Sequence, residues 1–146
     1  ADGGAMFGAI PKSAWSRRYP SDETNGCVLA MRSLVIKTDD GRIVLVDNGA
    51  GNKHLKQLSY YRFFNLVDLG TELRNRGIQP EEITDVVLTH LHFDHCGYTT
   101  QKDESTGHLF LSFPNANHWV SRTPWRKIPI LSRICKPSRM LIPYGC

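Results

Sequence analysis

The sequence lacks several features that would place it outside the ordinary globular proteins. None of its apolar runs approaches the roughly 20 residues of a membrane-spanning helix, and its start shows neither the basic nor the apolar region of a signal peptide. The four cysteines form no C-x-x-C pair, which favours reduced thiols and a cytoplasmic protein. We therefore expect no membrane partner. Contents of 40% hydrophobic and 22% charged residues over 146 positions are typical of one small domain with its own core.

Acidic residues are absent from the last 26 positions, and this absence explains the net charge. Residues 121–146 contain six basic residues and no acid, so residues 1–120 carry 12 basic and 14 acidic side chains, a net charge of −2. The overall charge of +4 is therefore poor evidence for a nucleic-acid partner, and we expect none. The same segment holds four of the eight prolines. We predict a folded portion over residues 1–120 and an irregular tail over 121–146.

The order of apolar patterns before residue 120 predicts an α/β architecture. Residues 1–26 are rich in Gly, Pro and polar residues, and we expect an irregular arm that packs through its aromatic side chains. Residues 39–41, Asp-Asp-Gly, provide the turn of a hairpin between two β-like runs. A leucine stripe over residues 66–73 predicts a helix that ends near Gly77. The expected strands cover residues 27–31, 34–36, 42–46, 83–89, 108–112 and 118–120.

Four candidate metal ligands occupy six consecutive positions after the strand expected over residues 83–89. His90 and His92 lie two residues apart, so an extended backbone directs both to the same side, and Asp94 and His95 follow at once. Imidazole and carboxylate groups are the usual ligands of zinc and similar divalent ions. A single histidine is most often an ordinary surface residue, but this concentration at the end of an apolar strand is hard to obtain by chance. The pattern predicts a metal site.

Asp47 is a further candidate because it directly follows the apolar run 42–46. In α/β folds the carboxyl ends of buried strands carry functional groups, which favours a role in a site. An aspartate that caps a turn fits the sequence about as well, since Gly49 and Gly51 follow closely. Both roles stay open at this point.

The ligand stretch resembles the metal-binding motif of the metallo-β-lactamase superfamily. The residues that carry the resemblance are His90, His92, Asp94 and His95 with Thr89 before them and Gly97 after them, and the upstream Asp47-x-Gly49 loop. Within the superfamily, the sequence looks most like the lactonase-like branch that includes quorum-quenching enzymes. That similarity lies in His-Leu-His-Phe-Asp-His-Cys-Gly, in residues 2–8 with Pro11-Lys12, and in residues 113–116. The resemblance covers about residues 1–120.

The resemblance implies the N-terminal half of a layered αβ/βα sandwich and a site for two zinc ions, with other divalent metals as alternatives. By analogy, His90 and His92 would bind the first metal, Asp94 and His95 the second, and Asp47 would hydrogen-bond to this network. The implied reaction is hydrolysis, in which a metal-bound water, oriented by Asp94, attacks the carbonyl carbon of a small-molecule ester or lactone. Thioesters and phosphotriesters stay open as substrates. A nuclease is disfavoured, because the basic charge lies in the tail.

The sequence departs from the family pattern after His95. The family completes its sites with a further His, a bridging Asp and a last His well downstream, whereas this chain continues with only His108, His118 and Asp103. Each metal would thus have two protein ligands, although catalytic zinc normally has three. The alternative hypothesis is a truncated, catalytically incomplete fragment that binds metal weakly or needs a partner chain. Half of a sandwich leaves one sheet face uncovered, so we also expect self-association through that face.

Overall fold

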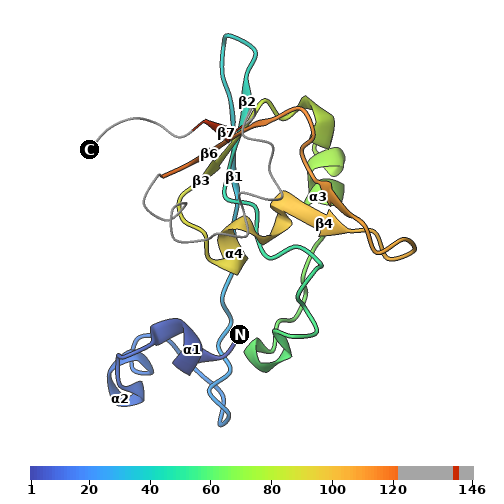
Figure 1. Cartoon of the computed structure of the whole chain (residues 1–146). Helices are drawn as coiled ribbons and strands as arrows, with labels where there is room; N and C mark the ends of the chain where they lie inside the picture. The colour runs from blue at the N-terminus through green and yellow to red at the C-terminus, as the bar shows by residue number, and fades with distance from the viewer. Residues whose placement is uncertain (122–139, 142–146) are drawn as a thin grey trace. The chain divides into compact units, whose positions relative to one another are not determined.

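The computed structural model describes residues 1–121 and the backbone of Met140–Leu141, and Figure 1 labels its helices and strands. The chain forms two compact units. One consists of Ala1–Met31 with His54–Leu66, and the other of Arg32–Lys53 with Val67–Cys146. Most of the tail predicted over residues 121–146 lies outside the described residues, so the boundary expected after residue 120 stays a prediction.

Short helices and aromatic packing characterise the first unit. Asp2 begins the first helix, because its carboxylate accepts a hydrogen bond from the N–H of Ala5 at 2.8 Å. The rings of Phe7 and Trp15 are stacked with centroids 4.9 Å apart, and Tyr19 lies 5.6 Å from Phe7. The predicted packing through aromatics is confirmed, whereas the arm is more regular than expected. Its helices are α1 (Gly3–Phe7) and α2 (Lys12–Trp15), and the unit also contains the 3₁₀ helix η1 (Ser59–Tyr61).

The strand predicted over residues 27–31 is wrong, since the described backbone of these residues forms no strand. Gly26 makes only an isolated bridge with Asp2. The N–H of Cys27 donates to the carbonyl oxygen of Ala1 at 2.8 Å, and the Cys27 side chain is buried. Apolar composition suits a strand, but a strand also needs a neighbouring strand along its length, and the pairing of this segment with the N-terminus is confined to residues 26 and 27.

The second unit is built on a five-stranded sheet (Figure 1). The last of the described strands is one of the five and pairs with β6 at the edge. The described strands are β1 (Leu34–Lys37), β2 (Ile43–Val46), β3 (Asp85–Leu88), β4 (Thr100–Lys102), β5 (Leu109–Leu111), β6 (Asn117–Val120) and β7 (Met140–Leu141). The sheet has the order β1-β2-β3-β6-β7. β1 and β2 pair antiparallel, whereas the pairs β2–β3, β3–β6 and β6–β7 are parallel. β4 and β5 form a separate antiparallel pair.

The hairpin predicted for the second unit is confirmed, and so is the helix, although it begins at Leu69 and does not include Leu66. Gly41 takes a φ of +83° in the turn between β1 and β2. Asp68 caps the helix, because its carboxylate accepts the N–H of Thr71 at 2.7 Å, and Gly77 follows the end of the helix with a φ of +70°. The helices of this unit are α3 (Leu69–Asn75), η2 (Pro80–Glu82), α4 (Phe93–Cys96) and η3 (Gly97–Thr99). None of the helices in the described ranges is long and apolar enough to cross a membrane.

One face of the sheet carries the hydrophobic core. The register pairs Leu45 of β2 with Val86 of β3, and both are fully buried. They belong to one buried cluster with Val120 of β6, Leu73 of α3 and Phe113. Burying side chains of this size contributes about 1.5–3 kcal/mol each, so this face holds the unit together.

The opposite face of the sheet carries further apolar side chains beside Asp85, and its edge is exposed. Leu34 and Ile36 of β1 are 57% and 42% exposed. The register aligns them with Val46 and Val44 of β2, so these side chains point to the same side of the sheet. We call this surface the apolar sheet face, defined by Leu34, Ile36, Val44, Val46, Val87 and Trp119.

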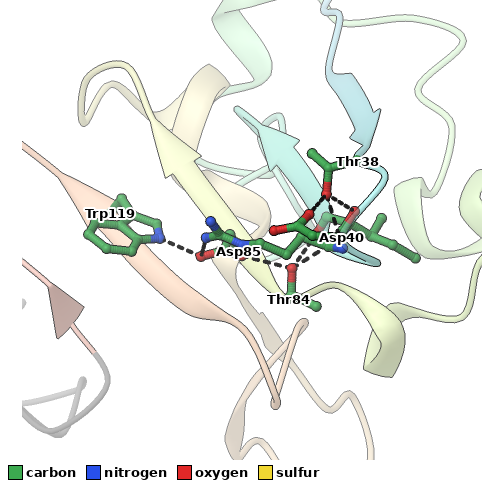
Figure 2. Close-up of polar contacts among 7 residues, drawn as sticks. Thr38, Asp40, Thr84, Asp85 and Trp119 are labelled. Atoms are coloured by element: carbon green, nitrogen blue, oxygen red, sulfur yellow. Dashed lines mark hydrogen bonds and ion pairs between the residues drawn. The ribbon is translucent and has the colours of Figure 1, made fainter.

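A buried carboxylate lies at the amino end of β3 (Figure 2). Asp85 is 2% exposed and forms an ion pair with Arg42, with distances of 2.7 Å to Nη2 and 3.1 Å to Nε. The hydroxyl of Thr84 and the indole N–H of Trp119 also donate to it, each at 2.7 Å. Burial raises the pKa of Asp85, but the hydrogen bonds from Arg42, Thr84 and Trp119 outweigh burial and hold the pKa below its ordinary value. The network connects the start of β2 with β3 and β6.

Candidate metal centre

The four predicted metal ligands lie in one loop at the carboxyl end of β3. β3 ends at Leu88, residues 89–92 have no regular structure, and α4 then turns the chain. His92, the residue before α4, has an extended backbone with φ −74° and ψ 148°. We call residues 89–97 the histidine loop. The loop lies at the edge of the sheet because it directly follows the apolar strand β3 in the sequence.

Contacts between imidazole rings gather the histidine loop around His90. The rings of His90 and His92 meet edge to face with centroids 4.7 Å apart, and the rings of His90 and His95 lie 4.0 Å apart at 45°. The carboxylate of Asp94 is 3.5 Å from Nε2 of His95. His92 is exposed, whereas the other three residues are partly buried. The structure thus brings all four predicted residues together.

Asp47 connects the end of β2 to the histidine loop. Its carboxylate accepts hydrogen bonds from the N–H of Thr89 at 2.9 Å, the hydroxyl of Thr89 at 2.7 Å and Nδ1 of His95 at 2.8 Å. Burial raises the pKa of Asp47, but the hydrogen bonds from His95 and Thr89 outweigh it and hold the pKa below its ordinary value. Because the ionised carboxylate accepts, Nδ1 of His95 carries the proton and Nε2 is the nitrogen left for a ligand.

The backbone of Asp47 is held in a conformation that few residues adopt. Its φ is +51°, in the left-handed region. The N–H of Asp47 donates to the carbonyl oxygen of Val87 at 2.9 Å, which continues the pairing of β2 with β3 beyond the last strand residue. The three hydrogen bonds of the carboxylate compensate for this conformation. The turn-capping role left open by the sequence is therefore not the whole role of Asp47, because its carboxylate binds the histidine loop.

Sequence reasoning did not identify Asn48 and Lys53, which also bind the histidine loop. The N–H of Asn48 donates to the carbonyl oxygen of His95 at 2.8 Å. The ammonium group of Lys53 donates to the carbonyl oxygens of Gly97 and Thr100. No periodicity or motif distinguishes these two residues in the sequence. What could have pointed to them is their position in the sequence, shortly after Asp47 and the end of β2.

The remaining downstream candidates lie apart from the histidine loop. His108 is exposed before β5. His118 is buried on the core side of β6, opposite Val86, and burial lowers its pKa. Asp103 is bound within its own turn by Ser105 and Thr106, and these hydrogen bonds lower its pKa to about 2.

The side-chain types in the histidine loop suit a divalent metal, but they do not form a complete set of ligands. Three imidazoles and a carboxylate are typical zinc ligands, and the bond from His95 to Asp47 is the support that metal-binding histidines usually have. Within the described residues, however, no group of three or more His, Cys, Asp or Glu side chains is arranged so that it could hold a metal ion. The loop therefore holds candidate ligands, but the described residues do not form a complete metal site.

The comparisons with known proteins agree with this geometry. Residues 32–98, which include β1 to β3, Asp47 and the histidine loop, match the model of the metallo-beta-lactamase superfamily. Residues 32–98 belong to the metallo-β-lactamase superfamily. The resemblance to the superfamily is thus confirmed, and with it the mixed α/β fold class, in partial form. A search of curated proteins gave no match.

Solved structures show how much of the superfamily fold is present. A probable metal-dependent hydrolase from Staphylococcus aureus is 34% identical, with a TM-score of 0.73 over 94% of this chain and 48% of its own. The hydrolase AbOPH of the beta lactamase superfamily is 24% identical, with a TM-score of 0.56 over 82% of this chain and 37% of its own, and shows the fold alone. The match to AidC, a dizinc quorum-quenching lactonase, is 28% identical over 63% of this chain and 26% of that one, with a TM-score of 0.47. This chain spans about half the length of the S. aureus hydrolase.

Proposed function

We propose that this chain supplies part of the catalytic site of a metal-dependent hydrolase, centred on the histidine loop. The observation that carries the proposal is the carboxylate of Asp47, which orients His95 through Nδ1 and holds Thr89 at the same sheet edge. A carboxylate that accepts the ring N–H of a histidine fixes the orientation of that ring, and metal-binding histidines commonly have such a partner. Membership of residues 32–98 in a hydrolase superfamily supports the same function.

Each residue of the histidine loop would have its own role in metal binding or in hydrolysis. His90 and His92 would hold one divalent metal and Asp94 and His95 a second, with zinc favoured by this donor set. Metals held there would activate water and polarise the bond under attack. Asp94 would orient that water and take its proton on a carboxylate oxygen, while Asp47 keeps the His95 ring in place. The ligands still missing would have to come from outside the described residues.

We infer that the substrate is a small-molecule ester or lactone. The support is the likeness of the histidine loop and of residues 2–8 to the lactonase-like branch. The absence of a C-x-x-C pair in the sequence also favours a cytoplasmic site of action. Thioesters and phosphotriesters are the competing substrate classes, and both can be tested beside lactones.

Zinc content per purified chain, with hydrolysis rates on lactone, ester, thioester and phosphotriester substrates, tests the proposal. We expect bound zinc that is lost in His92→Ala and retained in His108→Ala, because His108 is exposed and lies outside the loop. Lactone hydrolysis should follow the zinc content. About two zinc ions per chain would show that this chain completes the site itself. Equal zinc content in wild type and His92→Ala would refute the ligand assignment.

The second candidate is a catalytically incomplete unit that associates through the apolar sheet face. Its support is the exposure of Leu34 and Ile36, at 57% and 42%, on an edge strand. We expect wild type to associate in light scattering after size exclusion, and Leu34→Ser with Ile36→Ser to shift it toward monomer. Val28→Ser is the control, because Val28 is 75% exposed but belongs to the first unit. A monomeric wild type that melts cooperatively would contradict this candidate.

A further inference from the structure

One lysine lies against the main chain that follows His95, in surroundings unlike those of a surface lysine. Lys53 is partly buried, and its ammonium group donates to the carbonyl oxygens of both Gly97 and Thr100. Burial lowers the pKa of Lys53. Of the ion pairs among residues 1–121, none includes this ammonium group. The lysine therefore binds backbone and not a carboxylate.

The segment that ends at Lys53 runs along the histidine loop and pairs with it. The N–H of Asn48 donates to the carbonyl oxygen of His95 at 2.8 Å, and the N–H of Tyr98 donates to Gly49 at 2.9 Å. The side-chain amide of Asn48 donates to the hydroxyl of Thr99 at 2.8 Å. These bonds tie residues 47–53 to residues 95–100, so the end of α4 cannot move independently of the loop after β2.

The two segments approach so closely that side chains do not fit between them. A Cβ on Gly97 would lie 2.2 Å from the carbonyl oxygen of Ala50, and a Cβ on Gly51 would lie 2.7 Å from the carbonyl oxygen of Gly97. The carbonyl group of Gly97 is thus enclosed by backbone. A long side chain that reaches around the contact can satisfy it, and one ammonium nitrogen has enough hydrogens for two acceptors.

We propose that Lys53 is a positioning residue of the metal centre, which holds the carbonyl groups of Gly97 and Thr100 and thereby fixes the turn that carries Asp94 and His95. The proposal rests on the proposed function, since it connects Lys53 to metal binding. Without the ammonium group, the enclosed carbonyl oxygen of Gly97 and that of Thr100 lose this donor, and the turn opens toward water to replace it. The His95 ring then moves relative to Asp47, and the ligands lose their common position.

Lys53→Met is the decisive variant, because methionine keeps the apolar stem and removes every donor. We expect zinc affinity, measured by chelator competition, to fall about tenfold, as for other residues that support metal ligands. In the metal-free chain, amide hydrogen exchange of Asn48 and Tyr98 should accelerate by about tenfold, because both amides belong to the pairing that Lys53 closes. Lys53→Arg should restore part of both properties. Lys56→Met is the control and should change neither, since Lys56 is exposed.

The two measurements separate this proposal from the proposed function. Unchanged zinc affinity in Lys53→Met overturns the proposal, even if exchange is faster, because Lys53 would then only stabilise the fold. If Lys53→Met does not fold, Lys53→Gln, which keeps one donor group, should weaken zinc binding to an intermediate extent, and its failure to do so also overturns the proposal. A wild type that binds no zinc refutes the proposed function, and that result is visible without any Lys53 variant.

Discussion

Asp85 and Asp47 lie at opposite ends of the parallel pair β2–β3, and they use the same kind of group for different purposes. They are 2% and 8% exposed, and each accepts at least three hydrogen bonds. In both, burial disfavours the charge, but the hydrogen bonds outweigh burial and hold the pKa below its ordinary value. Two buried carboxylates are thus kept ionised by the same balance.

The donors decide what each carboxylate does. Asp85 faces Arg42, a permanent cation that contacts both of its oxygens, so its charge is neutralised inside the network. Asp47 faces Thr89 and the imidazole of His95, so its charge acts through a ring whose other nitrogen is available. A carboxylate closed by arginine stabilises the sheet. One that accepts from an imidazole fixes the orientation of a ring to which the proposed function gives a metal.

The largest expected effect is the loss of stability on removal of Asp85. Asp85→Ala takes the acceptor from Arg42, Thr84 and Trp119, so we expect the free energy of unfolding in urea to fall by about 3 kcal/mol. The estimate is at the low end for a broken buried ion pair, because the Arg42 side chain is 49% exposed. Asp39→Ala, at an exposed turn position, is the control. Zinc binding by the folded protein should be unchanged, and a loss of zinc would show that the two ends are coupled.

Gly97→Ala should have the next largest effect, at the other end of the pair. Its Cβ would lie 2.2 Å from the carbonyl oxygen of Ala50, so the histidine loop must move away from the loop after β2. We expect a loss of about 2 kcal/mol in unfolding free energy, as for other overpacked positions, and weaker zinc binding with it. Gly97 itself has an ordinary φ of −63°, so crowding and not backbone strain is the expected cause. Gly107→Ala measures strain alone, since Gly107 has a φ of +73° and its added Cβ would meet nothing closer than 3.8 Å. Equal losses in the two variants would argue against the close approach as the cause.

Much of this arrangement could be predicted from the sequence, because its signals are local. The apolar run before His90 predicts the strand β3, and the close spacing of His90, His92 and His95 predicts that their rings lie together, as they do. Asp47 was found in the same way, by its place at the end of a strand. Gly41 and Gly77 marked the hairpin and the end of the helix correctly, since a positive φ at such positions favours glycine.

The contacts that sequence reasoning missed join residues far apart in the chain. Arg42 and Asp85 are 43 positions apart, and Lys53 is 44 positions from Gly97. No pattern within a window of a dozen residues contains such a pair. The false strand over residues 27–31 has the same origin, because whether an apolar run becomes a strand depends on a distant partner.

Asp47→Asn tests the contrast between Asp47 and Asp85, because it removes the charge of the side chain and keeps its shape. Asparagine tolerates the left-handed backbone of this position, and its amide oxygen can still accept the N–H of Thr89. We therefore expect less than about 1 kcal/mol of lost stability. Zinc affinity should fall about tenfold, since the His95 ring loses its charged acceptor. A stability loss as large as that of Asp85→Ala, with zinc binding intact, would mean that Asp47 is structural too.

Acid should produce the smallest effect, and its sign follows from the lowered pKa of Asp85. A carboxyl group whose pKa is lower in the folded state stabilises the fold fully above its unfolded pKa of about 4. That contribution is lost as pH falls below about 4, toward the folded-state value. Between pH 6 and pH 3, wild type should therefore lose more unfolding free energy than Asp85→Asn, which has no proton to gain there. Parallel curves for the two proteins would mean that Arg42 does not favour the ionised form of Asp85, and the contrast with Asp47 would then lose its electrostatic basis.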